Sequence, residues 1–307
     1  AIMNKPSELV GREPPGKLPG GALQLSGPRK KLVLAGAGLV LCFSWPLYNL
    51  VRFALGSELY SHIVLIPLIS LYLVWLKRSC LSDRSAPDRI YPAVLLPGGL
   101  AAVVVFGLWT VAGTPLTRED SLALTTLAFV LLLVGLCGLY LGRQTFRAFA
   151  FPFGFLVFMV PLPTGMTEAI ETFLQHRSAS VAGFFFSLSD TPVFREDLSF
   201  QLPGIRIQVA PECSGIHSTL ALFITSVLAG YFFLRSRVSR VLLAFAVVPL
   251  ALVRNGFRVF TIGELCARIG PEMINSPIHR EGGPIFFALS LIPFFAFLFV
   301  LIWIERG

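Results

Sequence analysis

Charged residues are scarce in this chain. Asp, Glu, Lys and Arg make up 14% of its 307 residues, whereas hydrophobic residues make up 55% and the mean hydropathy is +0.76. A soluble globular domain carries about 25% charged residues, so this composition excludes that class and indicates an integral membrane protein. The net charge of +8 does not indicate nucleic-acid binding, because the Lys and Arg residues stand in short clusters between apolar runs.

Cysteine is also sparse. The five cysteines form no C-x-x-C pair, and their number is odd. The sequence therefore predicts neither a metal cage nor a disulfide framework, and we expect no metal and no cofactor. The chain also lacks internal repeats, which gives no support to solenoid or inverted-repeat transporter folds.

Long apolar runs fill most of the chain instead. A membrane span needs roughly 20 apolar residues. The stretches that approach this length are 32–52, 60–77, 91–113, 121–142, 146–162, 215–234, 239–260 and 284–304. We therefore predict an all-α polytopic membrane protein of about eight transmembrane helices, in one domain over 28–307, after a flexible cytoplasmic tail over 1–27.

Basic residues mark every second connection between these runs. They precede the first run, follow the second, and separate the fourth from the fifth and the sixth from the seventh. The clusters are Lys30 and Lys31; Lys77, Arg78, Arg84 and Arg89; Arg143 and Arg147; and Arg235, Arg237 and Arg240. By the positive-inside rule, both termini are predicted to be cytoplasmic.

The segment 162–212 is the only sizeable loop and falls on the outer side in this topology. Residues 167–189 have an amphipathic pattern, which predicts a helix at the membrane interface. Residues 192–210 alternate β-branched and polar residues around a Pro-Gly pair, which predicts a short β-hairpin. This loop either caps the helix bundle or contacts a substrate.

The octapeptide "PECSGIHS", 211–218, places Cys213 where this loop enters the sixth apolar run. Free N–H groups at a helix N-terminus favour a thiolate, and Ser214 and Gly215 add little bulk beside the sulfur. Cys213 is therefore a candidate nucleophile, with Glu212 beside it, although a lone cysteine in a membrane protein more often serves packing. His217 shares its helical face and is a candidate base.

Two arginines interrupt the seventh run. Arg254 and Arg258 are four residues apart and share one helical face. If the sixth and seventh runs form an antiparallel hairpin about Ser236, Arg258 lies level with Cys213 and Arg254 about one turn, roughly 5 to 6 Å, deeper. The alternative is a pair of snorkelling or ion-paired arginines with no chemical role.

A third polar group precedes the last run. His279 and Arg280 return to the outer layer that holds Cys213 and Arg258 in this topology. His62, at the outer start of the second run, can line the same cavity. Residues that are distant in sequence and meet at one interface are typical of a catalytic site.

In order along the chain, these stretches resemble the exosortase and archaeosortase family of membrane-embedded cysteine transpeptidases. The resemblance covers about residues 55 to 300. It rests on 60–78, on 161–218 with its "CSG", on the N-x-x-R from Asn255 to Arg258, and on the histidine before the last run. It implies that Cys213 is the nucleophile, that Arg258 or Arg254 is the arginine, and that His279 is the third catalytic residue.

The resemblance also implies a substrate class and a location. The substrates would be exported proteins with a C-terminal sorting signal, which comprises a short recognition motif, a transmembrane helix and a basic tail. The enzyme would cleave this signal through an acyl-thioester and transfer the protein to a cell-envelope acceptor such as a membrane lipid. It would lie in the plasma (inner) membrane of a prokaryote, with its active site on the extracytoplasmic side.

Two other functions fit parts of the pattern. A transporter or envelope assembly factor would use the outer arginines to bind an anionic ligand. However, the polar candidates all fall in the outer half, which suits a surface-facing site better than a conduit. A serine protease using Ser214 or Ser218 is disfavoured, because the G-x-S-x-G context is missing and Cys213 is the better nucleophile.

Overall fold

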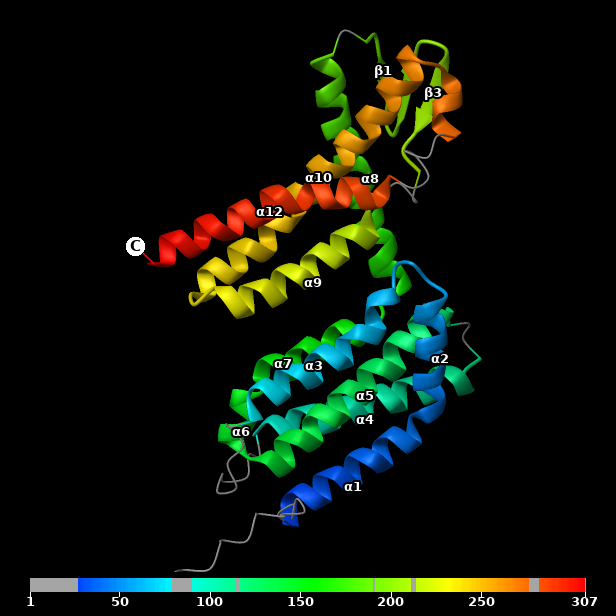
Figure 1. The fold of residues 1–307 in the computed structure, drawn as a ribbon. Helices are drawn as coiled ribbons and strands as arrows, with labels where there is room; N and C mark the ends of the chain where they lie inside the picture. The colour runs from blue at the N-terminus through cyan, green and yellow to red at the C-terminus, as the bar shows by residue number, and fades with distance from the viewer. Residues whose placement is uncertain are drawn as a thin grey trace, which may run out of the picture.

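The computed structural model describes residues 27–78, 90–113, 116–189, 191–210, 214–275 and 282–306. The predicted tail therefore lies outside the described residues, except for Gly27, which begins the first helix. The described chain forms two groups of helices and an outer part that holds a small sheet (Figure 1).

The first group contains the helices of the amino-terminal half. In Figure 1, α1, α3, α4, α5 and α7 run in a similar direction. The elements are α1 (Gly27–Cys42), α2 (Ser44–Leu55), η1 (Ser61–Val64), α3 (Leu65–Leu76), α4 (Ile90–Val111), α5 (Arg118–Leu141), α6 (Arg143–Ala148), α7 (Ala150–Phe155) and η3 (Leu156–Met159). The second group consists of α9 (Ile216–Phe233), α10 (Arg237–Arg268) and α12 (Gly283–Arg306), which contact one another.

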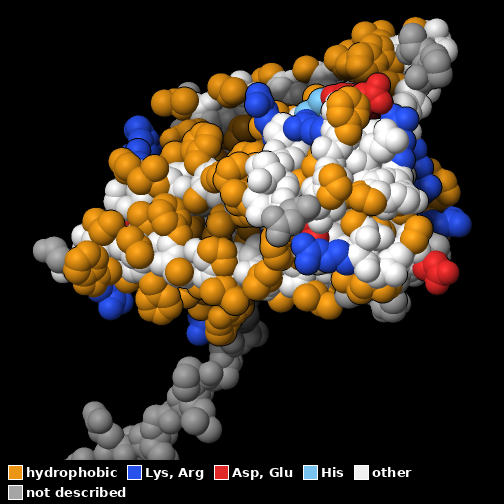
Figure 2. Space-filling model, turned by 90° about the horizontal axis from the view of Figure 1, so that it is seen from above, with side chains coloured by type: hydrophobic (Ala, Val, Ile, Leu, Met, Phe, Trp, Pro, Cys, Tyr) orange, Lys and Arg blue, Asp and Glu red, His pale blue; other side chains and the backbone are white. Residues whose placement is uncertain are grey.

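Five helices in the described chain are long and apolar enough to cross a membrane, and seven spans result if two bent pairs are counted as one span each. A shorter apolar helix covers Ser61–Leu76. Hydrophobic side chains cover much of the face seen in Figure 2. The predicted all-α membrane fold is therefore confirmed, whereas the predicted count of eight spans is not.

Proline accounts for two breaks in the predicted spans. α1 and α2 meet at a 66° bend, because Pro46 has no N–H to donate to the Cys42 carbonyl four residues earlier. Pro152 likewise leaves the carbonyl of Ala148 without its helical partner. The Nζ of Lys77 donates to this carbonyl instead, at 3.3 Å. The first and fifth predicted spans are thus divided into shorter helices.

A sharper bend of 86° turns the chain from η3 into α8 (Thr164–Ser187). Pro163 at this bend restricts the residue before it to extended backbone. Two neighbours fix the new direction. Asp120 accepts a hydrogen bond from the Thr164 N–H at 2.8 Å, and the Tyr60 hydroxyl donates to the Leu162 carbonyl at 3.2 Å. A helix is therefore present where the sequence predicted one over 167–189, and it is anchored to the first group.

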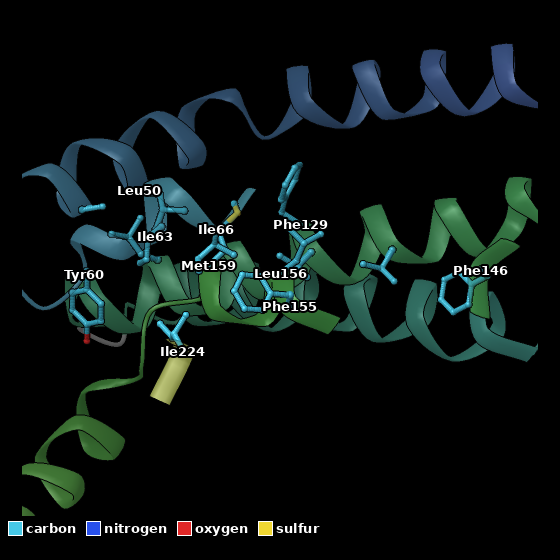
Figure 3. Close-up of a cluster of buried hydrophobic side chains, with 14 residues drawn as sticks. Leu50, Tyr60, Ile63, Ile66, Phe129, Phe146, Phe155, Leu156, Met159 and Ile224 are labelled. Carbon is cyan, nitrogen blue, oxygen red and sulfur yellow. The ribbon is translucent and has the colours of Figure 1, made fainter. Parts of the chain in front are cut away.

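The buried core of the first group joins the two groups of helices. Its side chains come mainly from α2, η1, α5 and η3, and Ile224 of α9 packs among them (Figure 3). The rings of Phe151 and Tyr231 stack at 3.7 Å, and the Lys77 amine lies 5.1 Å from the centre of the Tyr231 ring. α9 is therefore the element through which the second group packs against the first.

The outer part consists of α8, the upper half of α10 and an antiparallel sheet in the order β1-β2-β3. Its strands are β1 (Phe194–Glu196), β2 (Ser199–Leu202) and β3 (Ile205–Gln208), and η5 (Pro271–Asn275) follows α10. The predicted hairpin is present as β2 and β3, whose turn contains Gly204 at φ +80°. The sequence did not predict β1, which extends the hairpin to three strands.

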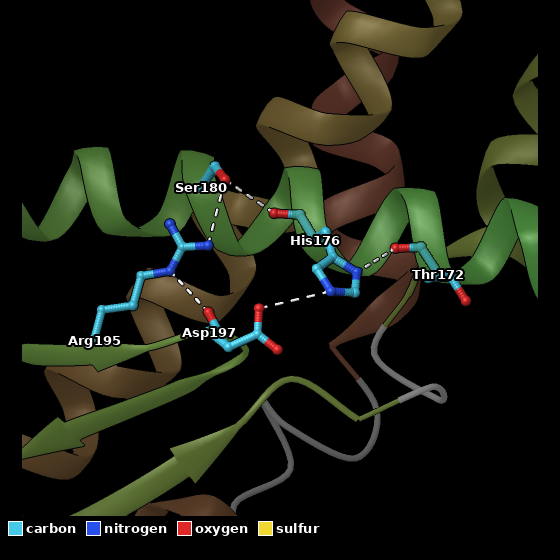
Figure 4. Close-up of polar contacts among 5 residues, drawn as sticks. All are labelled: Thr172, His176, Ser180, Arg195 and Asp197. Carbon is cyan, nitrogen blue, oxygen red and sulfur yellow. Dashed lines mark hydrogen bonds and ion pairs between the residues drawn. The ribbon is translucent and has the colours of Figure 1, made fainter.

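Polar contacts tie the β1–β2 turn to α8 (Figure 4). Asp197 lies 3.6 Å from Nε2 of His176, and the Nε of Arg195 donates to the Asp197 carbonyl at 2.9 Å. Arg195 also donates to the Ser180 hydroxyl at 3.4 Å. The sheet is thus held to α8 by polar contacts at its edge and by apolar packing beneath.

Glu305, at the end of α12, holds the start of α10. Its carboxylate accepts hydrogen bonds from the backbone N–H groups of Arg235 at 2.7 Å and Ser236 at 3.0 Å. N–H groups at a helix N-terminus have no partner within the helix, and an anion there complements the helix dipole. The carboxylate therefore fixes the position where α10 begins.

We expect Glu305→Ala to lower the thermal midpoint of the purified protein by several degrees, because two backbone N–H groups lose their acceptor. Glu305→Gln should lose less, since glutamine keeps one carbonyl oxygen. Glu168→Ala is the matched control, because Glu168 is exposed on α8. Equal midpoints for Glu305→Ala and Glu168→Ala in a thermal melt in detergent would contradict this role.

Candidate active site

The predicted site residues divide into those that the structure describes and those that it does not. Cys213, Glu212, His279 and Arg280 lie outside the described residues. The described ones fall on three elements, namely the turn before α9, the middle of α10, and η1. They are Ser214, Gly215, His217, Arg254, Asn255, Arg258 and His62.

The turn of Ser214 and Gly215 is packed tightly against α10. Ser214 is 2% exposed, and Gly215 has a left-handed backbone with φ +72°. A Cβ at position 215 would lie 3.1 Å from Nη2 of Arg254 and 3.1 Å from Oδ1 of Asn255. Glycine is therefore required here by both the backbone conformation and the close approach of α10.

Arg254 reaches this turn from α10. Its side chain is buried, and Nη2 donates to the Gly215 carbonyl and to the Thr219 hydroxyl, both at 3.3 Å. The Nη1 group is also buried and has no hydrogen-bond partner in the part of the chain that the structure describes. Buried N–H groups need hydrogen-bond acceptors, so the Nη1 group of Arg254 is positioned to donate to an acceptor at this site.

Asn255 holds the neighbouring carbonyl. Its Nδ2 donates to the carbonyl oxygen of Ser214 at 3.2 Å, in a buried position. Two consecutive side chains of α10 thus bind two consecutive carbonyls of the turn. Ser214 and Gly215 thus meet Arg254 and Asn255, which lie about forty residues later in sequence.

Arg258 lies one turn further along α10 and is half-buried. Its charge interacts with that of Arg254, as expected for two cations on one helical face. Arg254 and Asn255 donate hydrogen bonds to the turn before α9. The prediction that Arg258 is level with Cys213 stays a prediction, because Cys213 is outside the described residues.

Two of the predicted site residues are histidines, one on α9 and one in η1. His217 is exposed in the first turn of α9, and His62 lies in η1, where its Nδ1 is 3.1 Å from the Leu59 carbonyl. The two imidazoles interact electrostatically. The prediction that His62 lines the same cavity as Cys213 stays a prediction, because Cys213 is outside the described residues.

Thr219 and Gly256 belong to this site but were not predicted. Thr219 follows Gly215 by four residues, so the helical period places its hydroxyl on the face that Arg254 contacts. Gly256 lets α8 approach α10, because a Cβ there would lie 2.6 Å from Cγ1 of Val181. The spacing of Thr219 from Gly215 could have identified Thr219 from the sequence. No residue close to Gly256 in sequence indicates that Val181 packs against it.

The fold and this site define a polytopic helical membrane protein with a packed polar turn at one end of its second helix group. The family model described as transmembrane exosortase matches residues 51–296. The chain belongs to the transmembrane exosortase family. No curated protein and no solved structure matched it. Family membership supports a membrane transpeptidase role in general, with exported proteins as substrates.

Proposed function

We propose that this protein is a cysteine transpeptidase that cleaves the C-terminal sorting signal of exported proteins and transfers them to a cell-envelope acceptor. Cys213 is the nucleophile. The substrate carries a short recognition motif, a transmembrane helix and a basic tail, and the acceptor is a nucleophilic group such as that of a membrane lipid.

One observation carries this proposal. Arg254 and Asn255 bind the carbonyls of Gly215 and Ser214, the two residues that follow Cys213 in sequence. A buried guanidinium and a buried amide therefore fix the turn that follows Cys213 in sequence. Such placement of donors is typical of sites where negative charge develops during a reaction.

The chemistry proceeds in two halves. The Cys213 sulfur bonds to the scissile carbonyl carbon while a base takes its proton, and the carbonyl oxygen becomes an oxyanion. When the C–N bond breaks, the leaving amine takes up that proton and a thioester remains on Cys213. The acceptor then attacks the thioester carbon, gives its proton to the base, and releases the thiolate.

The arginine acts through its charge in this scheme. A guanidinium keeps its charge at neutral pH and donates a proton poorly, so it stabilises the oxyanion by charge and hydrogen bonding. Arg254 is the stronger candidate, because it is buried and donates to the carbonyl of Gly215, two residues after Cys213. His279 is the proposed base, and His217, four residues after Cys213, is the alternative.

The site is placed on the extracytoplasmic side. α6 and the α9–α10 turn, which carry Arg143, Arg147, Arg235 and Arg237, lie at the end of the helices opposite to the start of α9 (Figure 1). Basic connections mark the cytoplasmic face of a membrane protein. Both termini are cytoplasmic in this topology.

The proposal is tested by co-expressing an exported protein that carries a sorting signal with wild-type enzyme, Cys213→Ala and Cys213→Ser. Processing, followed as a mass shift on an immunoblot, should be lost in the alanine variant and fall at least about 1,000-fold in the serine variant, because an alcohol is a much weaker nucleophile. Thermal midpoints equal to wild type would show that both variants fold. Unchanged processing in both would exclude a thiol mechanism.

A further inference from the structure

β3 is the edge strand that precedes the proposed nucleophile in sequence. β3 pairs with β2 on one side only in the described sheet, whose order is β1-β2-β3. Gln208 ends β3, and Cys213 follows five positions later in the sequence. Five Cα-to-Cα steps span at most about 18 Å when extended. A chain bound along β3 would therefore be within reach of the cysteine.

The register shows which backbone groups of β3 point away from β2. Phe200 is opposite Ile207, and the Val209 N–H donates to the Leu198 carbonyl at 2.9 Å. Because bonded and non-bonded pairs alternate in an antiparallel ladder, Arg206 and Gln208 turn their N–H and C=O groups outward. Neither residue makes a backbone hydrogen bond on that side with the described part of the chain.

Side-chain packing fixes one face of the sheet, whereas the outward edge of β3 makes no backbone hydrogen bond with the described part of the chain. Ile207 and Phe200 are buried and pack against side chains of α8 and α10, including Phe186 and Val259. The side chains of Arg206 and Gln208 are exposed on the opposite face. The strand is therefore held rigidly in place and presents a row of alternate backbone donors and acceptors.

We propose that the outer edge of β3 binds an extended segment of the substrate as an added β-strand. This inference rests on the proposed function, which requires a stretch of polypeptide to lie beside Cys213 before its peptide bond is cleaved. Backbone hydrogen bonds to a sheet edge hold an extended peptide with little dependence on its side chains. The strand thus aligns the segment that precedes the scissile bond.

A second copy of this chain fits the edge less well. β3 has only four residues, and edge-to-edge pairing of two copies would bring their Arg206 side chains into one short ladder. Short, charged edge strands are typical of edges that resist self-pairing. A substrate segment carries no such repulsion.

The test removes one outward N–H from the edge. Gln208→Pro deletes this donor and leaves the bonds between β2 and β3 in place, whereas Gln208→Ala changes the side chain alone. Processing of the co-expressed reporter by the proline variant should fall about 3- to 10-fold below that of the alanine variant, as expected for one or two lost hydrogen bonds. Equal processing by the two variants would overturn the proposal.

Folding and self-association are checked in the same samples. The proline and alanine variants should have the same thermal midpoint and the same mass in light scattering. A lower midpoint for the proline variant would show that the chain itself covers the edge, and a change in mass would show a second copy there. Either result would overturn the substrate assignment.

A second measurement varies the peptide ligand and leaves the enzyme unchanged. Synthetic peptides from the reporter's recognition segment, each N-methylated at one successive position, compete with reporter cleavage by purified wild-type enzyme. Competition should be lost at alternate positions, because only every second N–H of an added strand faces β3. A loss without this period would contradict the edge site. If Cys213→Ala still processed the reporter, the proposed function itself would fail, whatever the peptides show.

Discussion

Arg254→Ala should lower kcat/KM for sorting-signal cleavage by about 100-fold or more. Removing one donor to a developing oxyanion typically costs a factor of 10² to 10³. The substitution also removes the hydrogen bonds from Nη2 to the Gly215 carbonyl and the Thr219 hydroxyl, so the turn after Cys213 loses a support. Arg254→Lys keeps a charge but not the planar fork of donors, and it should recover only a small part of the activity.

Arg258→Ala is the matched control for this prediction. It removes the same side chain one turn along α10, on the same face. We expect a much smaller loss from it than from Arg254→Ala, with activity and thermal midpoint measured on the same preparations. If Arg258→Ala abolished cleavage while Arg254→Ala remained active, Arg258 would be the charge that serves the reaction.

Gly256→Ala should destabilise the protein by about 1 to 2 kcal/mol. Its Cβ would lie 2.6 Å from Cγ1 of Val181 and 3.1 Å from the backbone nitrogen of Ala182, so α8 and α10 must move apart. Overpacking of this kind costs typically 1–3 kcal/mol, which exceeds the gain of up to about 1 kcal/mol from alanine in a helix. Gly256→Val should be worse, and both should reduce activity, since Asn255 is the adjacent residue.

Gly165→Ala separates packing from helix propensity. Gly165 lies in the first turn of α8, and a Cβ there would meet no atom within 4 Å. We expect its thermal midpoint to equal or slightly exceed that of wild type, because alanine reduces the entropy of the unfolded chain. A midpoint for Gly256→Ala as high as that for Gly165→Ala would show that α8 and α10 are not in close contact.

The sequence predicted the larger elements of the fold because hydrophobicity alone decides them. The apolar runs 91–113 and 121–142 correspond to α4 and α5 within a few residues. It did not predict the bends, because the average hydrophobicity of a stretch of residues does not reflect the missing N–H of Pro46. It also gave no sign of β1, whose pairing with β2 depends on contacts across the outer part.

The meeting of the turn before α9 with α10 was predictable from the length of the α9–α10 hairpin. Reflection about the connecting turn predicted Arg258 level with Cys213 and Arg254 about one turn deeper, which favoured Arg258. The hydrogen bonds to the Gly215 carbonyl and the Thr219 hydroxyl come from Arg254. A long arginine side chain can reach a neighbouring helical turn, so the level of its Cα does not decide which groups its guanidinium contacts.

Trapping the covalent intermediate tests the central claim most directly. Purified wild-type enzyme is mixed with the reporter substrate, quenched in acid, and analysed by mass spectrometry of the peptide that contains Cys213. We predict an adduct equal to the substrate without its sorting helix, bound to Cys213 and released by neutral hydroxylamine, as a thioester requires. Cleavage of the reporter with no adduct on Cys213, or an adduct that persists in Cys213→Ala, would contradict the account.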